Sequence, residues 1–196
     1  MKAPSAARIP MTFESPDFTQ TGYIGTLQLS SEQKDLAISV AKQRQEIALN
    51  GTFQKVAKIA ATQWLNDLKG ALAEVGLSEY LATVADKNGI EYELAELVSD
   101  KPVAKQDVTF GGKKFDIKGC ATLIEGLTER DDKLLIINCN QHDKKYDGYE
   151  GYFWVKTHDT HQDIFYFTRA EVSTWERVKG KGWAGDYYSM KIPAVN

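Results

Sequence analysis

The sequence predicts an α/β fold with a mixed central sheet, N-terminal helices and further helices that flank the sheet. Helical patterns occupy most of residues 30–89, and short strand-like runs follow from about Ile90. Polar segments with weak helical character lie between and after these runs, an order typical of mixed sheets. A chain of 196 residues corresponds to one domain. We therefore expect an irregular lead-in over residues 1–29 and a single domain over residues 30–196.

Composition and charge are those of an ordinary globular protein, with 42% apolar residues, 26% charged residues and a net charge of -3. This charge does not by itself indicate a nucleic-acid partner, although local basic patches also bind phosphates on acidic proteins. No apolar run is long enough to cross a bilayer, and the first residues lack the apolar core of a signal peptide. We expect no membrane partner and a cytoplasmic location.

The two cysteines, Cys120 and Cys139, both lie in apolar strand-like runs. We expect them to be reduced and buried in a cytosolic protein. A disulfide or a metal pair is the alternative. The sequence favours it less, because no second cysteine or histidine stands at ligand spacing from either residue.

The first half of the chain predicts two helices and a short third one. Ser30-x-x-Gln33 fits a capping box, so the first helix is expected to begin at Ser30 or the next residue and to end at Asn50-Gly51. Apolar residues at spacings of three and four predict a second helix over about residues 52–75, which Gly76 ends. The Asn-Gly pair is equally compatible with a kink in one long helix. Residues 78–89 predict the short third helix.

The second half predicts the strands. Residues 90–98 are ambiguous between strand and helix because of their glutamates, and residues 105–120 predict a hairpin. A polar bridge leads to Lys133–Asn138, whose continuous apolar run predicts a strand buried on both faces. Further strands are expected at 151–157, 163–168 and within 180–192, and a short helix at 168–178.

The hairpin places two aspartates opposite each other. Gly111-Gly112 suits a two-residue turn, which needs the positive φ that glycine adopts at little cost. The register then pairs Phe110 with Lys113 and Asp107 with Asp116. One face becomes apolar throughout, with Val108, Phe110, Phe115 and Ile117. The other face carries Asp107, Thr109, Lys114, Asp116 and Lys118.

Like charges directly opposite on paired strands destabilise a sheet, so this arrangement needs a reason. A divalent cation bound by both carboxylates removes the repulsion, and Mg²⁺ is bound in proteins by one or two carboxylates together with water and phosphate oxygens. Lys118, on the same side, can orient or deprotonate an attacking water or stabilise charge on a phosphate. These parts suit metal-assisted hydrolysis of a phosphodiester. The alternative is a solvated strand face with a weak ion pair between Asp116 and Lys118.

Asp107 together with Asp116-Ile117-Lys118 resembles the motif of the PD-(D/E)xK nuclease superfamily. There, an aspartate on one hairpin strand is followed on the next by Asp or Glu, any residue and Lys. The resemblance implies that Asp107 and Asp116 bind Mg²⁺, with Mn²⁺ as a substitute, and that Lys118 is the catalytic lysine. It implies a restriction-endonuclease-like core of a helix, a three-stranded meander, a helix and a further strand. Residues 31–140 can supply this core, with Lys133–Asn138 as the last strand and residues 149–196 as C-terminal strands and helix.

The chain departs from the motif at two positions. Gln106 stands where the motif has a proline. Many members also bring an acid from the first core helix, and the matching position after G-x-F here is Gln54. Glu46, two turns upstream, is the nearest acid and is the candidate third metal ligand. The segment Ser15-Pro16-Asp17 has the proline, but no D-x-K follows within reach.

Other polar residues are candidates for contact with substrate. Gln141 and His142 follow the buried strand, although a polar strand exit into a loop explains them equally well. Lys114 lies on the polar face of the hairpin, and Lys144-Lys145 stand beside aromatic residues, a mixture that can follow a phosphate backbone. The HDTH segment, residues 158–161, is expected to lie in a loop.

The resemblance implies a Mg²⁺-dependent endonuclease that hydrolyses DNA phosphodiester bonds, of a restriction-like, phage or mobile-element kind. A homodimer is the symmetric way for one site per chain to cut two strands. Two alternatives stay open. One is a nuclease-like fold that binds nucleic acid or protein without cutting, and the other is a different small enzyme with its site near Asn140–His142.

Overall fold

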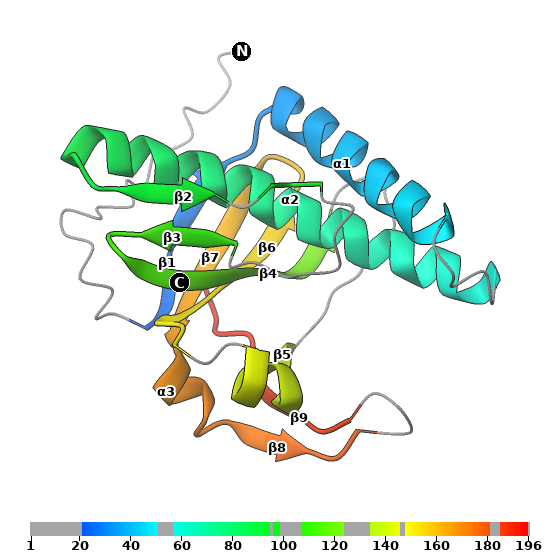
Figure 1. Ribbon diagram of the computed structural model, residues 1–196, viewed down its shortest axis with the longest axis vertical. Helices are drawn as coiled ribbons and strands as arrows, with labels where there is room; N and C mark the ends of the chain where they lie inside the picture. The colour runs from blue at the N-terminus through cyan, green and yellow to red at the C-terminus, as the bar shows by residue number, and fades with distance from the viewer. Residues whose placement is uncertain are drawn as a thin grey trace, which may run out of the picture.

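The computed structural model describes residues 21–50, 57–94, 96–98, 107–123, 134–145, 148–180 and 185–195. Helix α2 (Ala57–Asn88) packs across one face of a large sheet, and α1 (Ser31–Asn50) packs against α2 (Figure 1). A smaller sheet lies against the opposite face, where its apolar side chains share a core with the large sheet. The predicted α/β class is confirmed.

The large sheet has six strands and is mixed, as the sequence predicts. In spatial order the strands are β1 (Gly22–Gln28), β7 (His161–Thr168), β6 (Gly151–His158), β4 (Lys113–Leu123), β3 (Val108–Phe110) and β2 (Tyr92–Leu94). Within this sheet β4 and β6 run parallel, and the other neighbours are antiparallel. Parallel neighbours need a long connection, and the chain between β4 and β6 contains the first strand of the smaller sheet.

Part of the predicted lead-in is a strand. β1 lies at the edge of the large sheet and pairs with β7, so the assignment of residues 1–29 as irregular is wrong for Gly22–Gln28. The register shifts between Tyr23 and Gly25, which interrupts the alternation of side chains by which a strand is recognised in a sequence. Residues 1–20 lie outside the described part of the chain.

The start of α1 is confirmed in detail. The Gln33 backbone N–H donates to Ser30 Oγ at 3.1 Å, and the Ser30 N–H donates to Gln33 Oε1 at 2.9 Å, which completes the capping box. The helix ends at Asn50, as expected. The predicted start of the second helix at Thr52 lies outside the described residues.

The predicted break at Gly76 is wrong, because α2 continues through it to Asn88. The buried apolar stripe persists beyond the glycine at Leu77, Leu81 and Ala85, so packing against the sheet keeps the helix intact. Gly76 is the point of close approach to β7, and a Cβ there would collide with the side chain of Gln162. The glycine therefore serves packing and does not end the helix.

The run Lys133–Asn138 does not lie beside the hairpin. The described strand β5 (Leu134–Asn138) pairs with β9 (Tyr187–Lys191), which also pairs with β8 (Glu176–Val178) in the smaller sheet. Burial on both faces is wrong too, since Leu135 and Ile137 are buried while Leu134 and Ile136 are 38% and 46% exposed. Only one face of this sheet packs on the core.

The strand next to β4 is β6. It is buried on both faces, because α2 covers one side and the smaller sheet covers the other. Its residues Phe153 and Val155 face α2, and Tyr152 and Trp154 face the smaller sheet. The expectation that residues 31–140 hold the complete core is therefore wrong, because β6 begins at Gly151.

The C-terminal segment is less helical than predicted. α3 (Arg169–Val172) is a single turn, and Glu176–Val178 form β8. Ser173 and Thr174 donate their hydroxyls to carbonyls of the preceding turn, a competition that often ends helices. Cys120 and Cys139 are both buried, as expected. None of the helices in the described ranges combines the length and apolarity needed to span a membrane.

Candidate active site

The hairpin has the predicted turn and register. Gly111 and Gly112 adopt φ of +57° and +75°, and Val108 lies opposite Phe115. Asp107 directly precedes β3, and the observed pairing ends one residue later, at Val108 and Phe115. Both Val108 and Phe115 are fully buried, which fixes the apolar face toward α2 and turns Asp116 and Lys118 to the other face.

Asp116 is buried, with a relative exposure of 5%, and Lys118 Nζ lies 2.5 Å from its Oδ2. The contact has the distance of an ion pair but lacks hydrogen-bond alignment, and Oδ2 has no hydrogen-bond partner among the described residues. A solvated strand face is therefore the wrong interpretation of this aspartate. A buried carboxylate oxygen with spare acceptor capacity is a candidate ligand for a hard cation.

Asp107 is tied to the strand that carries the other two motif residues. Its Oδ2 accepts a hydrogen bond of 2.7 Å from the backbone N–H of Ile117. Burial raises the pKa of Asp107 well above its ordinary value, and the charges of Asp116 and Glu74 raise it further. The Ile117 N–H and the charge of Lys118 oppose this rise. Asp107, Asp116 and Glu74 thus form one electrostatic cluster with Lys118.

Glu74 comes from α2 and is held by Arg44 of α1. The guanidinium binds it in a fork, with Nη1 3.0 Å from Oε1 and Nη2 2.6 Å from Oε2. Arg44 Nε also donates to the backbone carbonyl of Leu97 at 2.8 Å. This network orients the glutamate beside Asp107 and compensates part of its charge.

The close approach of α2 to β4 explains why an acid on this helix reaches the hairpin. A Cβ on Gly119 would lie 2.7 Å from the backbone carbonyl carbon of Lys69, so only glycine allows the helix to cross the strand here. Glu46, the predicted third ligand, is exposed on α1, and its charge is not among those that shift the pKa of Asp107. The glutamate whose charge acts on Asp107 is Glu74.

Two tyrosines that no sequence pattern singled out, Tyr149 and Tyr152, lie near the same charges. Burial, with the charges of Asp116 and Asp107, raises the pKa of Tyr149 to about 12. Tyr152 lies opposite Asp116 in the β4–β6 register, and burial raises its pKa as well. Both hydroxyls therefore stay protonated at neutral pH. Tyr149 and Tyr152 become neighbours of Asp116 because β6 lies beside β4, a long-range pairing.

His142 does not line an open site. It is buried in η1 (Gln141–Lys145), with Nδ1 2.8 Å from the Tyr152 hydroxyl and Nε2 2.9 Å from Ser173 Oγ. Burial lowers its pKa, and the charge of Arg169 lowers it further. Both ring nitrogens are engaged, so the predicted contact of His142 with substrate is wrong. Because it is buried, His142 is also not accessible to a substrate in the alternative enzyme site considered at Asn140–His142.

The remaining residues predicted to contact substrate lie on the surface, except for one whose side chain is outside the described part of the structure. Lys114 is exposed at the hairpin, and Gln141 and Lys144 are exposed on η1. The side chain of Lys145 lies outside the described part of the structure. The structure thus brings together Asp107, Asp116 and Lys118 from the prediction and leaves the basic residues as separate surface groups.

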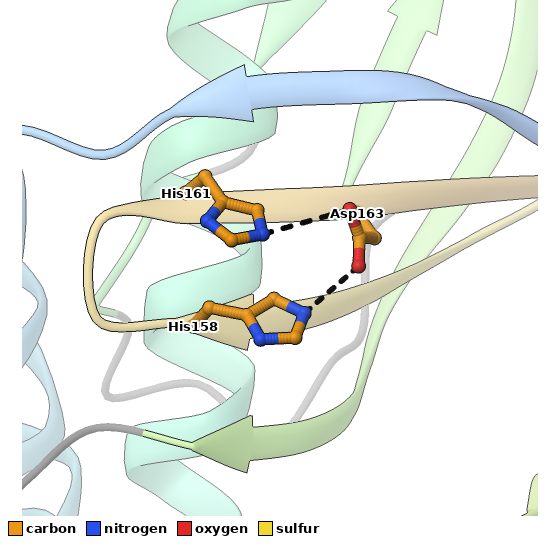
Figure 2. Close-up of side chains that lie close together, drawn as sticks. All are labelled: His158, His161 and Asp163. Atoms are coloured by element: carbon orange, nitrogen blue, oxygen red, sulfur yellow. Dashed lines mark hydrogen bonds and ion pairs between the residues drawn. The ribbon is translucent and has the colours of Figure 1, made fainter. Parts of the chain in front are cut away.

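The HDTH segment is not simply a loop. His158 ends β6 and His161 begins β7, and their rings stack with centroids 4.3 Å apart (Figure 2). Both histidines reach toward Asp163. Burial lowers the pKa of His161, and the charge of His158 acts in the same direction, while Asp163 opposes them.

Comparisons with known proteins add no relative. No protein-family model matches the chain, and neither the search of curated proteins nor that of solved structures found a match. The functional argument therefore rests on the fold and on the geometry of the carboxylate cluster.

Proposed function

We propose that the protein is a Mg²⁺-dependent endonuclease that hydrolyses DNA phosphodiester bonds at the end of the β3–β4 hairpin. The observation that carries the proposal is the buried Asp107, whose pKa is raised by burial and by the charges of Asp116 and Glu74, together with the ion pair between Asp116 and Lys118. Like charges at close range and out of water are unfavourable, and perturbed carboxyls of this kind are frequent at functional sites.

The strand order supports a restriction-endonuclease-like core. α2 is followed by the β2–β3–β4 meander, and β6 then lies parallel to β4. This order is compatible with the helix, meander and further strand that the motif implies, over residues 57–158. Between β4 and β6 the described residues hold β5 and the short helix η1 in place of a long helix.

The residues present suit a hard divalent cation. Asp116 Oδ2 lacks a hydrogen-bond partner in the described chain, and the carboxylates of Asp116 and Glu74 both act on the charge of Asp107. Asp107 and Asp116 would hold the ion, with Glu74 as the third acid. When bound, Mg²⁺ supplies a water of lowered pKa and charge stabilisation at the scissile phosphate.

The protein's own groups have separate tasks. The Ile117 N–H fixes the carboxyl of Asp107, and the Arg44 guanidinium fixes that of Glu74. Lys118 places a positive charge where an attacking water and a phosphate oxygen would meet. The protonated hydroxyl of Tyr149 is a hydrogen-bond donor at the same place. Exposed Lys114 and Lys144 would contact the DNA backbone.

The test is cleavage of supercoiled plasmid, and of a panel of phage and bacterial DNAs, with Mg²⁺ or Mn²⁺ and with EDTA. The proposal predicts cleavage that EDTA abolishes and that is lost in Asp116→Asn and Lys118→Gln. A folded protein that leaves every DNA intact with either metal would contradict an active enzyme.

The ion pair between Lys118 and Asp116 favours a second candidate, a nuclease-like fold that binds nucleic acid or protein without cutting. A lysine 2.5 Å from the carboxylate neutralises Asp116 without any metal. This candidate predicts DNA binding that is independent of Mg²⁺ and is accompanied by no nicking. A mobility-shift assay with and without EDTA distinguishes the two candidates.

A further inference from the structure

A second cluster of chemically active side chains lies at the far end of β6. His158, His161 and Asp163 each offer a ligand atom, and these atoms all lie within 4.8 Å of one another. His158 Nε2 is 2.8 Å from Asp163 Oδ2, and His161 Nε2 is 3.9 Å from Asp163 Oδ1. Figure 2 shows the two imidazoles side by side, both directed at the carboxylate.

We propose that His158, His161 and Asp163 bind a divalent transition-metal ion, Zn²⁺ or an ion of similar preference. Two imidazole nitrogens and one carboxylate oxygen are a donor set of catalytic zinc and related sites, whereas Mg²⁺ prefers oxygen alone. Zinc at about 2.0–2.1 Å from each ligand sets the ligand atoms about 3.4 Å apart. The ligand atoms of the three side chains lie within 4.8 Å of one another, so side-chain rotation is needed to bring them to this spacing.

The backbone already positions the three side chains. The β6–β7 hairpin brings His158 and His161 together across its turn, and Asp163 follows two residues along β7 on the same face. The rings are stacked, and the Nε2 atom of each faces the Asp163 carboxylate. Side-chain exposures of 24% and 35% for the two histidines leave room for water or another ligand on the ion.

Asp163 is held by a hydrogen bond from a neighbouring side chain, as metal-binding carboxylates usually are. Its Oδ1 accepts a hydrogen bond of 2.9 Å from Thr26 Oγ1 on β1, and the Tyr23 hydroxyl lies 2.7 Å from the same threonine oxygen. Such contacts hold a ligating carboxylate in place. A bound ion would link β1, β6 and β7 at one end of the large sheet.

This site is separate from the hairpin carboxylates. Asp116 lies opposite Tyr152, and His158 is further along β6 by roughly 20 Å, since a strand rises about 3.3 Å per residue. Lys156 is the residue directly opposite Asp163 on β6. Its ammonium group is a charged neighbour on the same face but is not one of the three proposed metal ligands. Replacing it provides a matched control for charge in the cluster.

The test is titration of the full-length chain with Zn²⁺ by calorimetry in excess Mg²⁺, with Co²⁺ absorption as a second readout. We expect one Zn²⁺ per chain, visible Co²⁺ bands of low coordination number, and a metal-induced rise in Tm. His158→Gln and His161→Gln should each weaken binding at least tenfold, and Asp163→Asn should do the same while keeping an acceptor for Thr26. Lys156→Gln and Asp116→Asn should keep the affinity.

Circular dichroism establishes whether each variant is folded. If Asp163→Asn does not fold, the test relies on His161→Gln, because His161 is the most exposed of the three ligands and its replacement disturbs the fold least. Absence of Zn²⁺ binding to the folded wild-type chain overturns the proposal. Binding that survives His158→Gln and His161→Gln also overturns it, and its loss in Asp116→Asn would place the ion at the hairpin instead.

Discussion

Asp107 and Asp116 lie close enough at the open end of the β3–β4 hairpin for the charge of Asp116 to help raise the pKa of Asp107. The Ile117 N–H that binds Asp107 Oδ2 holds the carboxyl in this unfavourable position. The hairpin therefore keeps two acids together at a cost in stability.

The charge of Asp107 should lower the stability of the folded protein at neutral and higher pH. The folded-state pKa of Asp107 is raised above its ordinary 3.8, so folding favours the protonated carboxyl, and stability is lost as pH rises through the raised pKa. In EDTA, Asp107→Asn should raise Tm at pH 8 by roughly 2–4 °C, the shift that about 1 kcal/mol causes in a chain of this size. The gain should shrink toward pH 4, and equal gains at both pH values would show that charge is not the cause.

Divalent-ion affinity at the hairpin should depend on pH in the opposite sense. A proton on Asp107 competes with the ion, so Mg²⁺ binding should strengthen as pH rises through the raised pKa, by up to about tenfold per pH unit for one displaced proton. Calorimetry in two buffers of different ionisation enthalpy measures the proton released. Asp107→Asn should remove most of the pH dependence, and a wild-type affinity that is flat with pH would argue against this ligand.

Glu74 and Glu46 offer a matched pair of variants. Glu74→Gln should lower Mg²⁺-dependent cleavage by about 10–100-fold, the effect typical of groups that bind or orient metal ligands. Glu46→Gln should leave it unchanged, because Glu46 is exposed on α1. Initial rates of plasmid nicking at saturating Mg²⁺ compare the two variants. The reverse result would restore Glu46 as the third acid.

Arg44 is a positioning residue in this scheme. Arg44→Lys keeps the positive charge but cannot bind Glu74 in a fork, so we expect cleavage to fall and to be partly recovered at higher Mg²⁺ concentration. A purely structural role for Arg44 would instead lower Tm and leave the Mg²⁺ dependence of the rate unchanged. Measuring both quantities on the same preparations separates the two roles.

The sequence predicted what local pattern decides and missed what distant contacts decide. The Gly111-Gly112 turn and the alternating β3 and β4 residues specify the hairpin register, so Asp107, Asp116 and Lys118 were found. The choice of β6 over β5 as the neighbour of β4 depends on pairing between segments far apart in the chain.

The third acid was missed for the same physical reason. Glu74 reaches Asp107 because α2 crosses β4 closely at Gly119, and α2 continues as one helix through Gly76. Both glycines suggest flexibility or a helix end when they are considered without their neighbours. In the fold they are points where a side chain would collide, with Gln162 at one and Lys69 at the other.

The last prediction tests this crossing. Gly119→Ala should lower stability by about 1–3 kcal/mol, because the new methyl group would lie against the backbone of Lys69 and force α2 away from β4. Gly70→Ala is the control on the same helix, since its Cβ would meet nothing closer than 3.6 Å, and helix propensity should make it neutral or stabilising by up to about 1 kcal/mol. Urea unfolding measures both free energies. Because displacement of α2 also moves Glu74 from Asp107, Gly119→Ala should weaken Mg²⁺ binding in the folded fraction, and an unchanged affinity would mean that the helix does not position the acid.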